Sequence, residues 1–143
     1  MNVTRLLGTV RHRRSRGLVV LLSVLVLTGC AGGARAESAR SSAQGFEHAV
    51  SQGDGATACD LLAPETAAEV AESAGSDCAS GVLEEDLPEA GPVERTSVCG
   101  RSAQVQLAAD TLFLSHFDDG WKVLAAGCTP RPGKSYDCTV QGG

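Results

Sequence analysis

The spacing of apolar residues changes from helical to extended partway along this 143-residue chain. In residues 46–83, apolar positions recur three or four residues apart, which places them on one face of an α-helix. The apolar stripes consist of Phe46, Ala49 and Val50, then Ala58, Leu61 and Leu62, then Ala67, Val70, Ala71 and Ala74, and finally Ala79, Val82 and Leu83. This pattern predicts four short helices.

Turn and capping residues mark the ends of these helices. Gly53 ends the first helix, and Asp54 is placed to cap the second. Pro64 suits the first turn of the third helix, where its missing N–H costs no hydrogen bond, and Asp77 is placed to cap the fourth. An acidic, proline-containing stretch at residues 84–92 then closes the helical half.

In the second half the period shortens to two, as in strands that keep one face in water. The ranges that we predict as strands are 93–99, 102–107, 111–117 and 121–126. Asp118-Asp119-Gly120 forms a tight hairpin turn. Helices followed by antiparallel strands indicate an α+β fold, in which short N-terminal helices pack on a curved antiparallel sheet.

The N-terminal segment has the three parts of a secretory signal. Five arginines form a basic region, and residues 18–27 form an apolar core. This core is too short to cross a ~30 Å hydrocarbon layer as a helix. Leu27-Thr28-Gly29-Cys30 resembles the lipobox at which bacterial prolipoproteins are lipidated and cut. An ordinary cleaved signal and an uncleaved anchor are the alternatives, and Arg13-Arg14 leaves both the general secretory and the twin-arginine export routes open.

The lipobox resemblance implies that Cys30 becomes the first residue of the mature lipoprotein and carries a diacylglyceryl thioether. An added amide-linked acyl chain, palmitate for example, is common in such proteins. Two or more acyl chains hold a protein on a membrane without a transmembrane helix. We therefore predict a signal peptide at 1–29, a lipidated flexible tether at 30–44 and a single domain at 45–143. The predicted location is the extracytoplasmic face of the cell membrane.

Cleavage would also change the charge of the chain. Five of the 12 Lys and Arg residues precede the cleavage site and all 17 Asp and Glu residues follow it, so the formal charge goes from −5 to −10. An acidic surface argues against binding nucleic acid or anionic lipid through a basic patch. The expected partners are the membrane, through the lipid on Cys30, and an envelope or membrane protein. The sequence does not identify a small ligand.

The number of cysteines predicts disulfides in the exported domain, because an oxidising compartment favours them. With the lipidated cysteine set aside, five of the six cysteines remain, so one has no partner. We pair Cys59 with Cys78, which joins two helical segments, and Cys128 with Cys138, which ties a strand to the C-terminal tail. Each of these disulfides closes a loop of the chain and stabilises the folded state by roughly 2–3 kcal/mol in the chain-entropy model. Cys99 is then a possible free thiol, and the sequence leaves other connectivities open.

The order of elements resembles the nuclear transport factor 2-like (cystatin-like) superfamily, in which helices pack into a curved sheet to form a cone. The residues that carry this resemblance are the Phe46–Gly53 helix with Asp54, Cys59-Asp60-Leu61-Leu62 and Asp119-Gly120-Trp121-Lys122-Val123. The chain also resembles small lipoproteins of high-GC Gram-positive bacteria, which end in a similar Gly-Trp hairpin followed by cysteines. The resemblance spans residues 45–140 and implies a fold and a location, without an assigned activity.

Catalytic members of this superfamily place Asp, His or Tyr in the cone. His48 and His116 are the histidines beyond the signal, and we expect both near the surface. Ser115 and His116 are neighbours on a strand and point to opposite faces, so they cannot form a nucleophile–base pair. Cys99 is a further candidate, because an imidazole on an adjacent strand would activate its thiol.

Cys-x-x-Cys, His-x-x-x-His and glycine-rich phosphate loops do not occur in the sequence, so we predict neither a metal nor a cofactor. We expect a non-catalytic binding or accessory module without catalytic residues. The alternative is a small-pocket enzyme of the superfamily that uses His116 with an acid such as Asp110 or Asp118.

Overall fold

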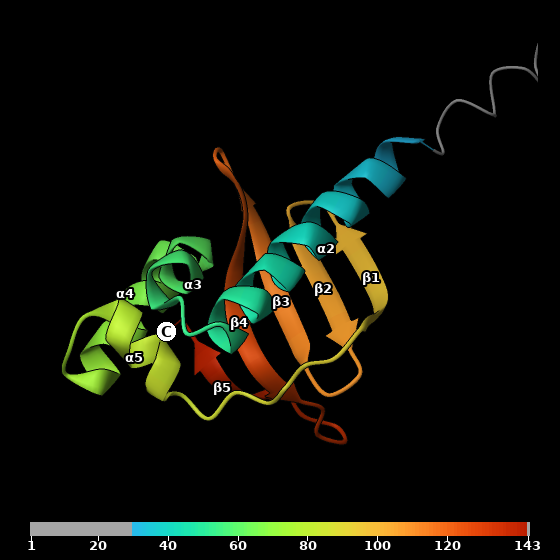
Figure 1. The fold of residues 1–143 in the computed structure, drawn as a ribbon. Helices are drawn as coiled ribbons and strands as arrows, with labels where there is room; N and C mark the ends of the chain where they lie inside the picture. Colours follow the sequence, from blue (N-terminus) through green and yellow to red (C-terminus); the bar gives the residue numbers. More distant parts are fainter. Residues whose placement is uncertain (1–29, 143) are drawn as a thin grey trace, which may run out of the picture. The chain divides into compact units, whose positions relative to one another are not determined.

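A computed structural model describes residues 30–142, and the chain from Gly32 onward forms one compact unit with its own hydrophobic core (Figure 1). The predicted signal peptide, residues 1–29, lies outside the described residues. The elements are α2 (Cys30–Ser51), α3 (Gly55–Leu61), α4 (Pro64–Ala74), α5 (Cys78–Glu84), β1 (Val93–Cys99), β2 (Ser102–Leu107), β3 (Thr111–Phe117), β4 (Gly120–Thr129) and β5 (Asp137–Gln141). None of the helices described is long and apolar enough to cross a membrane. The protein is α+β, as predicted.

The five strands form one antiparallel sheet in the order β1-β2-β3-β4-β5. The strands predicted at 93–99, 102–107 and 111–117 are confirmed, and the hairpin turn after β3 is also confirmed because Phe117 pairs with Gly120. The fourth strand runs to Thr129, beyond the predicted end at residue 126. Val105, Leu112, Leu114 and Val123 are fully buried and belong to one core cluster with the helices.

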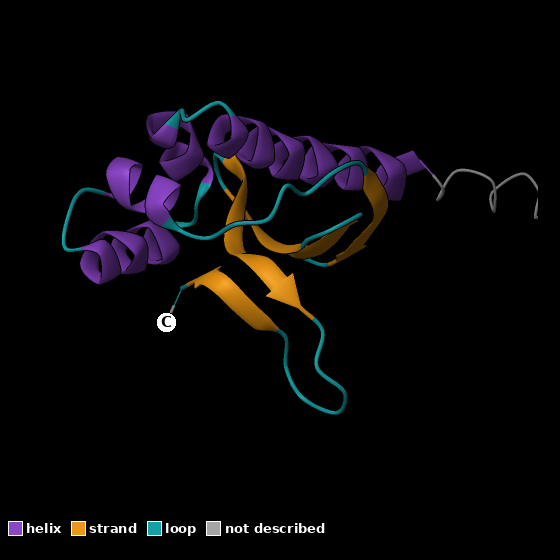
Figure 2. Ribbon diagram, turned by 60° about the horizontal axis from the view of Figure 1, so that its bottom comes forward, coloured by secondary structure: helices purple, strands orange, loops and turns teal. Residues whose placement is uncertain are grey.

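Helix α2 lies across one face of this sheet, and α3, α4 and α5 gather near β4 and β5 on the same side (Figures 1 and 2). The flexible tether expected at residues 30–44 is therefore corrected, because this segment is helical and forms part of α2. Ala39 and Ala43 continue the stripe of Phe46 with helical spacing, and all three are fully buried. Alanine adds little hydrophobicity to a sequence pattern, yet its small side chain lets a helix pack closely on a sheet.

Polar contacts also hold the first half of α2 on the domain. The Arg35 guanidinium lies 5.8 Å from the centre of the Trp121 ring, and it donates a hydrogen bond to the carbonyl of Gly100 at 2.7 Å. Cation–π contacts of this kind stabilise by roughly 0.5–1 kcal/mol at exposed sites. The domain boundary predicted at residue 45 thus falls inside a continuous helix.

The predicted caps of the short helices are confirmed. The Asp54 carboxylate accepts from the N–H of Thr57, and the Asp77 carboxylate accepts from the N–H of Ser80. Each carboxylate thereby satisfies one N–H that the first turn of a helix leaves without a partner. Pro64 occupies the first turn of α4, where its missing N–H costs nothing.

Both predicted disulfides are present. Cys59 of α3 bonds to Cys78 of α5 with a Cα–Cα distance of 6.1 Å, and Cys128 of β4 bonds to Cys138 of β5. The second bond joins residues that also face each other in the sheet. The C-terminal tail, where no strand was predicted, forms β5 because its backbone pairs with the extended end of β4. Cys99 is exposed and outside both disulfides.

Candidate functional site

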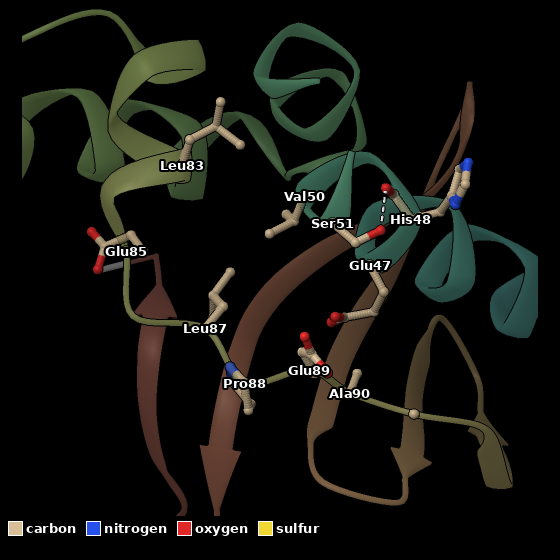
Figure 3. Close-up of a pocket in the computed structure, with 11 residues that line it drawn as sticks. Glu47, His48, Val50, Ser51, Leu83, Glu85, Leu87, Pro88, Glu89 and Ala90 are labelled. Atoms are coloured by element: carbon tan, nitrogen blue, oxygen red, sulfur yellow. Dashed lines mark hydrogen bonds between the residues drawn. The ribbon is translucent and has the colours of Figure 1, made fainter. Parts of the chain in front are cut away.

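A cavity of about 520 Å³ opens between the last turns of α2, the end of α5 and the segment that follows α5 (Figure 3). Its volume lies within the range of about 300–1,000 Å³ that is usual for small-molecule sites. Apolar side chains form much of the wall, namely Val50, Leu83, Leu87, Pro88 and Ala90. The ionisable side chains that line it are Glu47, His48, Glu85 and Glu89.

The end of α2 fixes one wall of the cavity. Gly53 adopts a φ of 70°, which residues other than glycine rarely adopt, and the helix ends just before it. The hydroxyl of Ser51 donates to the carbonyl of His48 at 2.8 Å, the bond drawn dashed in Figure 3. The last turn of α2 is therefore closed by its own hydrogen bonds, and its side chains have defined directions.

The opposite wall is the extended segment of residues 85–91. Its backbone is attached to the β2–β3 connection, because the N–H of Ala109 donates to the carbonyl of Ala90 at 3.0 Å. A second bond of 3.0 Å joins the N–H of Ala108 to the carbonyl of Pro92. These bonds anchor the C-terminal end of the wall to the sheet.

Glu47 supplies the most perturbed group of the cavity. Its carboxyl points from α2 towards Leu87 and Glu89 (Figure 3), and its Oε1 atom is buried. Burial, the nearby charge of Asp110 and a hydrogen bond with Asp110 together raise the pKa of Glu47 to about 8. At neutral pH this carboxyl is therefore mostly protonated, and its O–H donates to Asp110.

Asp110 interacts with Glu47 and accepts hydrogen bonds from the backbone. Its Oδ1 atom accepts from the N–H groups of Thr111 at 2.5 Å and Cys128 at 2.8 Å, and its Oδ2 atom accepts from Gly127 at 3.0 Å. Burial raises the pKa of Asp110, while these three N–H groups act in the opposite direction. Because they favour the carboxylate of Asp110, the proton of the pair resides on Glu47.

The residues of the proposed alternative enzyme, His116, Asp110 and Asp118, are not among the residues that line the cavity. Asp110 immediately precedes β3, whereas His116 lies near the other end of that strand. The His116 ring packs edge-on against Trp121 with its centre 5.1 Å from the Trp121 ring centre, and His116 is not among the residues that line the cavity. Asp118 lies in the exposed turn after β3. His48 lines the cavity, but its ring points away from the centre (Figure 3).

The expectation that Cys99 and His116 lie on adjacent strands is corrected. Cys99 is in β1 and His116 is in β3, with β2 between them. Cys99 pairs with Ser102, and Ser102 pairs in turn with Ser115. The edge position of β1 thus separates the thiol from the imidazole.

Glu47 was not predicted as a site residue, because a glutamate next to an exposed histidine is typical of a helix surface. A weak signal existed in the helical spacing. Glu47 follows buried Phe46 and lies four residues after buried Ala43, so it borders the apolar face. Its pairing with Asp110, 63 positions away in the sequence, had no local signal.

Within the described part of the chain, no group of three His, Cys, Asp or Glu side chains is arranged to hold a metal ion. Comparison of the chain with protein-family models, with curated proteins and with solved structures gave no match.

Proposed function

We propose that this protein is a lipoprotein, anchored through Cys30 on the extracytoplasmic face of the cell membrane, whose domain binds a small ligand in the cavity beside Glu47. The lipobox at the end of the apolar N-terminal segment supports the anchor. One observation carries the binding function, namely a cavity of about 520 Å³ that is lined by apolar side chains and by Glu47.

Small-molecule sites bury most of the surface of their ligand against apolar side chains. The apolar side chains around Glu47 would give such a molecule a surface to bury. Glu47 would fix its orientation, as the few polar groups of ligand sites usually do.

The nuclear transport factor 2-like arrangement belongs to the same proposal. Its support is the long helix that lies across one face of an antiparallel meander, with shorter helices at one end of the sheet (Figure 2). The cavity here opens at the C-terminal end of that helix.

The length of α2 adds a geometric argument. Glu47 lies 15 residues after Gly32 in a continuous helix, which corresponds to about 22 Å at 1.5 Å per residue. From Gly32 onward this segment would therefore be a rigid part of the domain in place of a flexible tether.

Filling the cavity tests the binding function. The chain that begins at residue 30 with Cys30→Ser contains the whole described core, and a neutral fluorescent probe such as N-phenyl-1-naphthylamine should bind it. Val50→Trp places a large side chain in the cavity and should weaken probe binding at least ten-fold. Gln44→Trp adds the same side chain at an exposed position of α2 and should leave binding unchanged. Equal binding by both variants would exclude the cavity as the site.

An enzymatic function is the second candidate, and the raised pKa of Glu47 favours it, because a carboxyl that titrates near neutral pH can act as a general acid or base. Glu47, in place of His116, would then transfer the proton. Two results together would establish catalysis. The protein would turn over a bound molecule, and Glu47→Gln would abolish this turnover while leaving binding of the neutral probe unchanged.

A further inference from the structure

We propose that residues 85–90, which we call the strap, are a pH-sensitive cover that stays closed over the carboxyl of Glu47 while Glu47 is protonated and opens when Glu47 ionises. The proposal concerns the protein without a ligand, so it goes beyond the proposed binding function. It names a conformational change and the group that controls it.

The strap covers Glu47 through the side chain of Leu87. The carboxyl of Glu47 points towards Leu87 and Glu89, and its Oε1 atom is buried (Figure 3). The Leu87 side chain also reaches Gly127, since its Cδ2 atom lies 2.9 Å from where a Cβ atom of that residue would be. Gly127 in turn donates its N–H to Asp110, the partner of Glu47. Leu87 therefore packs beside the carboxyl pair, and the strap limits the access of water to it.

Ionisation of Glu47 would bring negative charges together without a positive charge between them. Burial, followed by the charge of Asp110, raises the pKa of Glu47 to about 8. The strap adds the carboxyls of Glu85 and Glu89, and α2 adds His48, whose ring points away (Figure 3). Neither lysine nor arginine occurs among the residues that line the cavity. Loss of the proton from Glu47 therefore makes the closed arrangement less favourable.

Two of the three parts that meet at Glu47 are held firmly. Asp110 accepts three backbone hydrogen bonds, two of them from the end of β4 beside a disulfide. On α2, Phe46 and Ala49 are buried on the core side of the helix. Rotation of the helix would expose both of these apolar side chains, so α2 cannot easily turn Glu47 outward.

The strap is the part with the fewest attachments. In the described part of the chain, the only backbone hydrogen bond of residues 86–89 runs from the N–H of Leu87 to the carbonyl of Glu85 within the strap. The first backbone bond to the sheet comes at Ala90, whose carbonyl accepts from the N–H of Ala109 at 3.0 Å. Segments with few hydrogen bonds and little buried surface open at the lowest free energy. We therefore expect the strap to move first.

The proton determines the direction of the pH effect. With the strap closed, Glu47 keeps its proton up to a pH of about 8. With the strap open, water solvates the carboxyl, and its pKa returns towards the ordinary value of 4.5. Opening between these pH values releases one proton, so its equilibrium constant should rise about ten-fold per pH unit.

Hydrogen exchange of the Ala109 amide measures this opening, because its N–H donates to the strap. The chain from residue 30 with Cys30→Ser is followed by NMR at pH 6, 7 and 8. The protection factor of Ala109, which is corrected for the intrinsic pH dependence of exchange, should fall about ten-fold per pH unit. In 1 M urea it should change little, because opening of the strap exposes little surface, whereas amides of the central strand β3 should lose protection.

Three variants identify the controlling groups. Glu47→Gln imitates the protonated side chain, so the protection factor of Ala109 should no longer depend on pH. Glu37→Gln removes an exposed carboxyl of the same helix outside the cavity and should follow the original chain. Leu87→Ala leaves less apolar surface to hold the strap closed, so it should lower the protection of Ala109 roughly ten-fold at each pH and keep the pH dependence.

Each contrary result overturns the proposal. Protection of Ala109 that is constant with pH, or that falls equally in Glu47→Gln, would remove Glu47 as the controlling group. Protection that decreases in urea as steeply as that of β3 would mean that the whole domain unfolds in place of the strap. Unchanged protection in Leu87→Ala would show that this side chain does not hold the strap. The neutral-probe experiment tests the binding function independently of these results.

Discussion

Glu47 shows how one side chain can set the pH response of a domain. Its pKa is about 8 in the folded protein, against 4.5 for an ordinary glutamate. Between these values the folded state holds a proton that the unfolded chain has released. The free energy of unfolding should therefore decrease as pH rises from about 4.5 to about 8. The raised pKa of Asp110 acts in the same direction, whereas the lowered pKa values of Asp54, Asp77 and Asp119 affect stability only at lower pH.

Glu47→Gln should remove most of this decrease, because glutamine imitates the protonated side chain at every pH. Urea unfolding at several pH values between 5 and 8.5 measures the effect. The variant should be about as stable as the original chain at pH 5 and more stable at pH 8.5. Glu65→Gln, at an exposed position of α4, is the control and should follow the original curve. Parallel curves for all three proteins would contradict the raised pKa.

Asp110 is a structural carboxylate as well as the partner of Glu47. Its three backbone hydrogen bonds connect the start of β3 to the C-terminal end of β4, next to the Cys128–Cys138 disulfide. Gly127, one of the donors, has a φ of 67°, and a Cβ atom there would approach the Thr139 side chain to 2.8 Å. The backbone conformation of β4 at this point therefore depends on a glycine. This conformation positions the N–H groups of Gly127 and Cys128 that donate to Asp110.

At the scale of elements, helix α2 differs most from its sequence-based description. A 22-residue helix covers the sheet where a flexible tether and a short helix were expected. The buried stripe of alanines on α2 makes this difference testable.

Ala39→Asp places a charge at a fully buried position of α2 and should lower the free energy of unfolding by at least about 2 kcal/mol. Ser38→Asp introduces the same charge at the adjacent exposed position and should change it by less than about 0.5 kcal/mol. Urea unfolding of both variants provides the measurement. If residues 30–44 were a flexible tether, the two substitutions would have the same small effect.

At the scale of the whole molecule, the proposed function has two parts, the lipid anchor on Cys30 and the cavity of the domain. The anchor depends on the thiol of Cys30 alone, because this sulfur would receive the diacylglyceryl group. Cys99, the exposed thiol of the domain, provides a matched control.

We expect Cys30→Ala to abolish incorporation of labelled palmitate when the full chain is expressed in a bacterium that processes lipoproteins. Cys99→Ala should leave both labelling and membrane association unchanged. Gel autoradiography of the membrane and soluble fractions distinguishes the variants. Label that persists in Cys30→Ala would contradict the lipobox assignment.

The elements of the sheet and the caps could be read from the sequence because their causes are local. The alternation that defines β2, the turn before Gly120 and the capping aspartates each depend on residues a few positions apart. The pairing of Cys59 with Cys78 also follows from local order, since the two short helices that carry them are near neighbours. Short-range geometry limits such segments to few conformations.

Only the tertiary structure decided the length of the packed helix, the strand at the C-terminus and the site. Ala39 and Ala43 show no strong pattern until a sheet covers them, and β5 forms because β4 offers it a free edge. Glu47 and Asp110 meet because α2 crosses the sheet above the start of β3, and their mutual effect depends on burial, which no local pattern encodes. The sequence by itself determined most of the helices and strands and predicted the location at the membrane, since both depend on neighbouring residues. The cavity and the protonation of Glu47 depend on distant parts of the chain that packing brings together.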